Sequence, residues 1–156
     1  QGNSATDHGG AIRSDDSSAT SIAGCLFNSN SAQYGGAAFF GGASQNAATT
    51  AAIIKTTMWG NHAVAEGGAI YNRATLTIND TIIWGNTAPD ASQWYFEFSD
   101  TVTVTYSDVE GSGYNGTDGV IAEDPLFTDT AADDFTLQTG SPAIGTASDS
   151  ENMGAF

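Results

Sequence analysis

Hydrophobic and polar residues alternate along several segments of the chain. The segments 74–84 and 98–106 show this alternation most clearly, and both are rich in β-branched residues. Alternation with a period of two is typical of β-strands, whereas an amphipathic helix needs apolar residues every three or four positions. No long segment has the helical period. The pattern therefore predicts an all-β protein.

Two short motifs recur in the same order along the chain. The copies of the tripeptide Gly-Gly-Ala that begin at residues 9, 35 and 67 are each followed by an apolar residue with Asn three positions later. Alignment on this Asn brings similar residues into columns. The columns are Asn30, Asn61 and Asn86; Ile22, Ile53 and Ile78; Phe27, Met58 and Ile83; Cys25, Thr56 and Thr81; and Ala32, Ala63 and Ala88. Val104, Ser107, Val109 and Ser112 continue the Ile, Thr, Phe and Asn columns in a further copy.

These columns predict a chain that coils on itself, because one repeat alone cannot bury its apolar side. Equivalent residues then stack ~4.8 Å apart through parallel strand pairing. We predict a single-domain, right-handed parallel β-helix of about five turns over residues 1–156. The expected turns are about 9–34, 35–66, 67–92 and 93–119, with a closing segment at 120–156. A β-sandwich is the alternative, and it gives no reason for the columns.

The two motifs also predict what lies at the corners of the coil. Asn tolerates left-handed backbone, and stacked Asn side chains hydrogen-bond along a ladder, so the Asn column is expected at a tight corner. Gly-Gly-Ala gives a bend in which no Cβ atom clashes with the next turn.

The motifs Gly9-Gly10-Ala11-Ile12 and Gly67-Gly68-Ala69-Ile70, paired with Phe27-x-x-Asn30, resemble the repeat of the polymorphic outer-membrane-protein family. Met58 and Ile83 depart from that repeat by replacing Phe. The resemblance implies a surface-exposed passenger domain with an adhesive role. The motifs Asp124-Pro125-Leu126-Phe127 and Ser141-Pro142-Ala143-Ile144-Gly145 are similar to those of secreted bacterial β-helix proteins. There they belong to a run that closes the β-helix.

The net charge of −15 makes phosphate-rich partners and anionic membranes poor ligands. We therefore expect neither nucleic-acid binding nor membrane insertion, and no apolar stretch reaches the length of a transmembrane helix. Thirteen of the 18 acidic residues lie from Asp90 onward, where there is no Lys or Arg. The single cysteine, Cys25, cannot form an internal disulfide.

The candidate catalytic residues are the carboxylate pair Asp15 and Asp16, close to Arg13. Neighbouring strand residues point to opposite faces, so this pair would act together only in a turn. A solvated loop explains the cluster better, and we predict that the chain is not an enzyme.

No cofactor is expected, apart from Ca²⁺ in the acidic loop that contains Asp108, Glu110 and Asp118. The alternative is that these residues only form turns. Asn79 and Asn115 lie in N-glycan acceptor patterns, which matter only where the source glycosylates proteins.

The edges of a β-helix recruit other strands unless they are covered. Only eight residues precede the first Gly-Gly-Ala, so we expect another copy or further turns of a longer passenger to cover that end. The predicted function is a non-catalytic module for structure or adhesion, secreted to the extracellular cell surface. Its expected partners are itself, head to tail, and carbohydrate or a host surface. The alternative is a domain that binds or cleaves polysaccharide.

Overall fold

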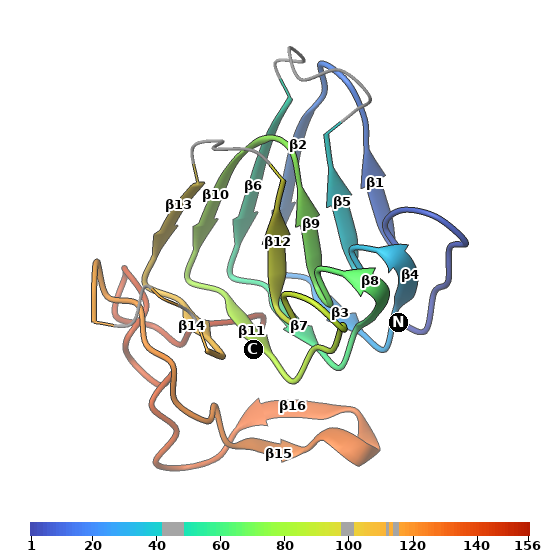
Figure 1. The fold of residues 1–156 in the computed structure, drawn as a ribbon. Coiled ribbons are helices and arrows are strands. Elements are labelled where there is room, and N and C mark those ends of the chain that lie inside the picture. Colours follow the sequence, from blue (N-terminus) through green and yellow to red (C-terminus); the bar gives the residue numbers. More distant parts are fainter. Residues whose placement is uncertain (42–48, 98–101, 112, 114–115) are drawn as a thin grey trace.

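A computed structural model describes residues 1–41, 49–97, 102–111, 113 and 116–156 (Figure 1). The described residues form strands and a single short 3₁₀ helix, η1 (Thr130–Ala132). Most strands lie in parallel sheets in which each strand pairs with its counterpart from the neighbouring repeat. The all-β prediction is confirmed, and the in-register parallel sheets fit a β-solenoid.

Four parallel sheets form the sides of a stack, which we call the coil. The first sheet contains β1 (Ile12–Ser14), β5 (Ala38–Phe40), β9 (Ile70–Asn72) and β12 (Trp94–Phe96). The second contains β2 (Ala19–Ala23), β6 (Thr50–Ile54), β10 (Thr75–Asn79) and β13 (Val102–Thr105). The third contains β3 (Leu26–Asn28), β7 (Thr57–Trp59), β11 (Ile82–Trp84) and β14 (Asp108–Val109), and the fourth pairs β4 (Ser31–Tyr34) with β8 (His62–Glu66).

The apolar columns predicted from the repeat are confirmed by the strand register. Ile22 pairs with Ile53, Ile53 with Ile78, and Ile78 with Val104. The second column runs through Phe27, Met58, Ile83 and Val109. All eight side chains are at most 8% exposed and belong to one core cluster. Each stabilises the fold by roughly 1.5–3 kcal/mol through burial, which makes the columns the main reason that the repeats stack.

The coil begins before the first Gly-Gly-Ala. Ser4 pairs with Ser31 and His8 with Tyr34, so residues 2–8 add a partial strand to the fourth sheet beside β4. The fourth sheet therefore extends one repeat further than the other three at the N-terminal end.

At the C-terminal end, the third sheet extends further than the others. Ile121 pairs with Asp108 of β14, and Val120 is 1% exposed within the core cluster. Val120 and Ile121 therefore close the interior of the coil on this side.

The remaining C-terminal segment follows the outside of the coil. The antiparallel hairpin of β15 (Phe127–Asp129) and β16 (Asp134–Leu137) lies below the third sheet in Figure 1. Phe135 packs against Trp59 of β7, with ring centroids 5.5 Å apart, and Met153 belongs to a buried cluster with Ile82 of β11. The segment expected to close the β-helix thus runs back along its side.

Candidate functional site

The Asn column forms a buried, hydrogen-bonded ladder at a corner of the coil. The backbone N–H and the Nδ2 of Asn30 both donate to Oδ1 of Asn61, over 3.0 and 2.8 Å. Asn61 donates to Asn86 in the same way, over the same two distances. Asn3 donates to Asn30 and is a rung that the sequence alignment missed. The ladder has one polarity, because every rung donates toward the C-terminal end.

The left-handed residue at this corner is the one before each Asn. Gly2, Ser29, Gly60 and Gly85 have φ between 57° and 66°, while the ladder Asn residues do not have positive φ. The prediction that Asn itself adopts the left-handed conformation is therefore wrong. Its amide is required for the ladder, and the preceding residue makes the bend.

A second ladder of hydroxyl groups lies at the corner between the second and third sheets. The backbone N–H of Cys25 donates to Oγ1 of Thr56, that of Thr56 to Oγ1 of Thr81, and that of Thr81 to Oγ of Ser107. Each hydroxyl in turn donates to the carbonyl two residues earlier. This confirms the Thr column with its Cys25 and Ser107 ends, and gives it a hydrogen-bonding role.

In the Gly-Gly-Ala copies that begin at residues 9, 35 and 67, the second residue must be glycine, because the backbone of the next repeat leaves no room for a Cβ atom. A Cβ atom on Gly10 or Gly36 would lie 2.2 Å from the carbonyl oxygen of Gly36 or Gly68, respectively. A Cβ on Gly68 would lie 2.1 Å from the carbonyl oxygen of Ser92. Ser92, the next residue in this column, is exposed and carries a side chain. Within the described residues, no further repeat follows above it.

A cavity of about 530 Å³ lies at this C-terminal end of the ladder. It is lined by Asn86, Ala91, Ser92, Gln93, Trp94, Glu110 and Gly111. The lining mixes an aromatic ring, a carboxylate, amides and a hydroxyl. The repeat pattern does not reveal this site, because Ala91-Ser92-Gln93 takes the place of Gly-Gly-Ala.

The floor of the cavity is a polar network that ends the Asn ladder. Nδ2 of Asn86 donates to Oε1 of Gln93 over 2.8 Å, and Nε2 of Gln93 donates to Oε2 of Glu110 over 2.7 Å. The backbone N–H of Gly85 donates to the same Glu110 oxygen over 2.8 Å. Gln93 and Glu110 thus replace the next Asn. Ser112, which the alignment placed in the Asn column, lies outside the described residues.

The outer face of the first sheet carries a row of side chains at one register position. Phe39 of β5, Tyr71 of β9 and Tyr95 of β12 stack with ring centroids 5.7 and 5.1 Å apart, and Arg13 of β1 begins the row. Arg73 lies over the rings of Phe39 and Tyr71 and donates to Glu97. Burial alone would raise the pKa of Glu97, but hydrogen bonds from Tyr71 and Arg73 hold it below its ordinary value.

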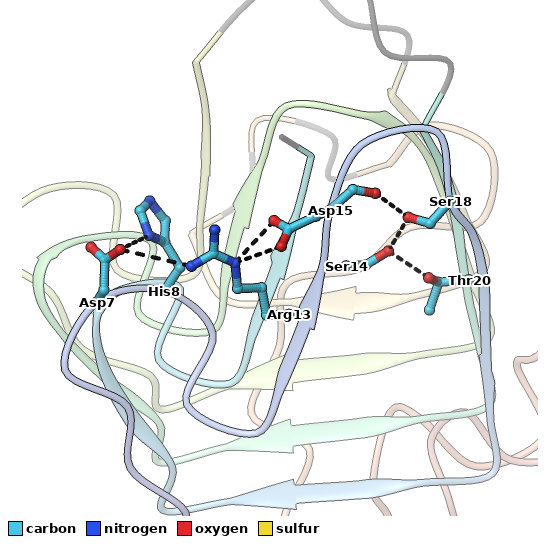
Figure 2. Close-up of polar contacts among 7 residues, drawn as sticks. All are labelled: Asp7, His8, Arg13, Ser14, Asp15, Ser18 and Thr20. Atoms are coloured by element: carbon cyan, nitrogen blue, oxygen red, sulfur yellow. Dashed lines mark hydrogen bonds and ion pairs between the residues drawn. The ribbon is translucent and has the colours of Figure 1, made fainter. Parts of the chain in front are cut away.

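Arg13 lies between two carboxylates at the N-terminal end of this row (Figure 2). Its Nε is 2.9 Å from Asp15, and its Nη1 is 3.8 Å from Asp7. Asp7 also lies 2.7 Å from Nδ1 of His8. Among the candidate catalytic residues, the structure brings Arg13 and Asp15 together, while Asp16 is a separate exposed residue. Arg13, Asp7 and Asp15 are half exposed and form a surface ion-pair network.

The three residues of the predicted Ca²⁺ loop take different places. Asp108 is fully buried and accepts from the backbone N–H of Glu123, Glu110 is part of the ladder end, and Asp118 is exposed. Within the described part of the chain, no group of three or more His, Cys, Asp or Glu side chains is placed to hold a metal ion.

Asp108 is an acid buried at the junction of the coil and the C-terminal segment. Its Oδ2 has no hydrogen-bond partner. Burial, together with the nearby charges of Glu123 and Asp124, raises the pKa of Asp108 to about 7 against the opposing hydrogen bond from the Glu123 N–H.

Of the two glycan acceptor patterns, one can be placed. The Asn79 side chain bonds with Asp80 and Thr105, and Thr81 of the same pattern is fully buried in the hydroxyl ladder. Asn115 lies outside the described residues.

No family model, curated protein or solved structure matches the chain. The described residues contain no helix long and apolar enough to cross a membrane.

Proposed function

We propose that this chain is a non-catalytic structural and adhesive module, a right-handed parallel β-helix of about five turns that is displayed on an extracellular surface. One observation carries the proposal: β1, β2 and β3 are edge strands at the N-terminal end of their sheets. Unpaired edges of this kind accept strands of matching direction. The module would thus form part of a longer coil.

The open edge of β2 is defined by its hydrogen bonds to β6. The carbonyl of Ser18 accepts from Thr50, and the N–H of Gly24 donates to Ile54. Because backbone groups alternate sides along a strand, those of Ser21 point away from β6. This part of β2 is ready to pair with a further strand.

The added strands come from preceding turns of a longer passenger or from a second copy. Rigid head-to-tail stacking is less favoured, because Ile121 pairs with Asp108 where β3 of a following copy would have to pair. The geometry therefore favours addition of turns at the N-terminal end.

Sedimentation velocity and negative-stain electron microscopy of the isolated chain test this proposal. We expect its mass to rise with concentration, because the open edge of β2 accepts a strand from another copy even though rigid head-to-tail stacking is blocked. Ser21→Pro removes an N–H that faces away from β6 and should keep the chain monomeric. Ser21→Thr keeps that N–H and should associate as the parent does. A chain that stays monomeric at high concentration contradicts the proposal.

A carbohydrate-active module is the second candidate. It is favoured by the cavity at the C-terminal end, where Trp94 and several hydrogen-bonding side chains converge.

A further inference from the structure

We infer that the cavity at the C-terminal end of the ladder binds a neutral sugar residue, such as the end of a glycan chain, with Trp94, Ser92 and Glu110 as its main contacts. The inference rests on the adhesive role proposed above and names the ligand class. It depends on three properties of the cavity: its size, the chemistry of its lining, and the charge around it.

The cavity has the size and position of a ligand site. A volume of about 530 Å³ lies within the ~300–1,000 Å³ range of small-molecule pockets. It lies where a following repeat would continue the fourth sheet, because Ser92 occupies the column in which Gly10, Gly36 and Gly68 must lack a Cβ. The side chain of Ser92 therefore takes the direction in which the next repeat would lie.

The lining offers an aromatic surface beside hydrogen-bonding groups. Trp94 continues the interior column of Ile12, Ala38 and Ile70, and it is half-buried at the end of the coil. Beside it are the Ser92 hydroxyl and the Glu110 carboxylate, whose Oε2 accepts two hydrogen bonds from the protein. A pyranose ring presents C–H groups on its face and hydroxyls at its edge, which suits this combination.

The ladder end itself argues against a peptide strand as the ligand. An added strand would have to pair with the edge at Asn86, but Nε2 of Gln93 already donates to the Asn86 carbonyl. Nδ2 of Asn86 is likewise bonded to Gln93. A strand would have to displace this network, whereas a sugar can lie on top of it.

Charge selects neutral sugars over acidic ones. Glu110 lies in the cavity wall, and the chain carries a net charge of −15. A uronic acid would bring a further negative charge to this site, where no Lys or Arg is among the lining residues.

An NMR titration of the ¹⁵N-labelled full chain tests the inference. The probes are glucose, galactose, N-acetylglucosamine and their β-linked disaccharides, with glucuronic acid as the acidic comparison. We expect saturable shifts of the Trp94 indole N–H, the Gln93 side-chain amide and the Gly111 amide for at least one neutral sugar. The dissociation constant should be on the order of millimolar, and glucuronic acid should cause no such shifts.

Ser92→Trp fills the cavity, and its side chain meets no following repeat among the described residues. It should therefore weaken sugar binding at least tenfold. The NMR spectrum of the rest of the coil should stay unchanged. Thr77→Trp, an exposed change in the middle of the second sheet, should bind as the parent does. Ser92→Ala removes only the hydroxyl and should fold normally with weaker binding, so a folded variant remains if Ser92→Trp does not fold.

Three results would overturn the inference: no saturable shifts with any neutral sugar, binding that survives Ser92→Trp, or binding of a peptide with the sequence of residues 2–8 in place of sugar. The proposed function is judged separately, by whether the chain associates through β2 in the sedimentation experiment. An associating chain that binds no sugar keeps the structural role and loses this site.

Discussion

The Asn ladder is continued at the N-terminal end of the coil and is terminated at the C-terminal end. At the N-terminal end, Asn3 adds a rung of the same kind, and β1 and β2 remain open edges. At the C-terminal end, Gln93 and Glu110 replace the next Asn, and Val120 fills the interior. The difference shows that a repeated column is extended by a like residue and ended by an unlike one. The extension and the recognition proposed above would therefore lie at opposite ends of the coil.

The largest expected effect is a loss of stability from a side chain added within the glycine column, which a change at the end of the column should not cause. Gly68→Ser would place a side chain against the Ser92 carbonyl, where a Cβ lies only 2.1 Å away, so we expect a loss of about 3 kcal/mol or more in the free energy of unfolding. Ser92→Gly should change it by less than about 0.5 kcal/mol, because no repeat among the described residues packs on Ser92. Urea denaturation measures both. Equal losses would contradict the idea that the column ends at Ser92.

The Asn ladder should be strong in the middle and weak at its N-terminal rung. Asn61→Ala leaves the buried Nδ2 and backbone N–H of Asn30 without their acceptor, and we expect a loss of roughly 2–4 kcal/mol. Asn3→Ala removes an exposed rung and should cost about 1 kcal/mol or less. Thermal unfolding of the two variants gives the comparison. A cost for Asn3 as large as that for Asn61 would mean that the ladder is no weaker at its open end.

A smaller, pH-dependent effect is expected at the C-terminal end alone. Asp108 has a raised pKa of about 7 when folded, so the folded state holds its proton more tightly than the unfolded state. The contribution of this proton to the free energy of unfolding is fully present below about pH 4 and is lost as the pH rises toward 7. Asp108→Asn should therefore be more stable than the parent by about 2 kcal/mol at pH 8 and nearly equal to it at pH 4. Unfolding curves across this range check the sign, and a constant difference at all pH values would refute it.

Spacing along the sequence determined the core of this protein. The repeated Ile, Phe/Met/Ile, Thr and Asn positions fixed which residues stack, because parallel pairing places equivalent positions of successive repeats directly above one another. The Gly-Gly-Ala motif likewise identified the positions where the next repeat leaves no room for a Cβ. These features are periodic, and a period can be read from one chain.

Tertiary structure alone decided the features that are not periodic. The place of Glu110 at the ladder end, rather than in a calcium loop, depends on hydrogen bonds from Gly85 and Gln93 of the preceding repeat. The path of the C-terminal segment along the third sheet depends on contacts such as those of Ser148 with Asp80, 68 residues away in the chain. No local pattern encodes such contacts, because each joins two segments that meet only once, after the repeats have stacked.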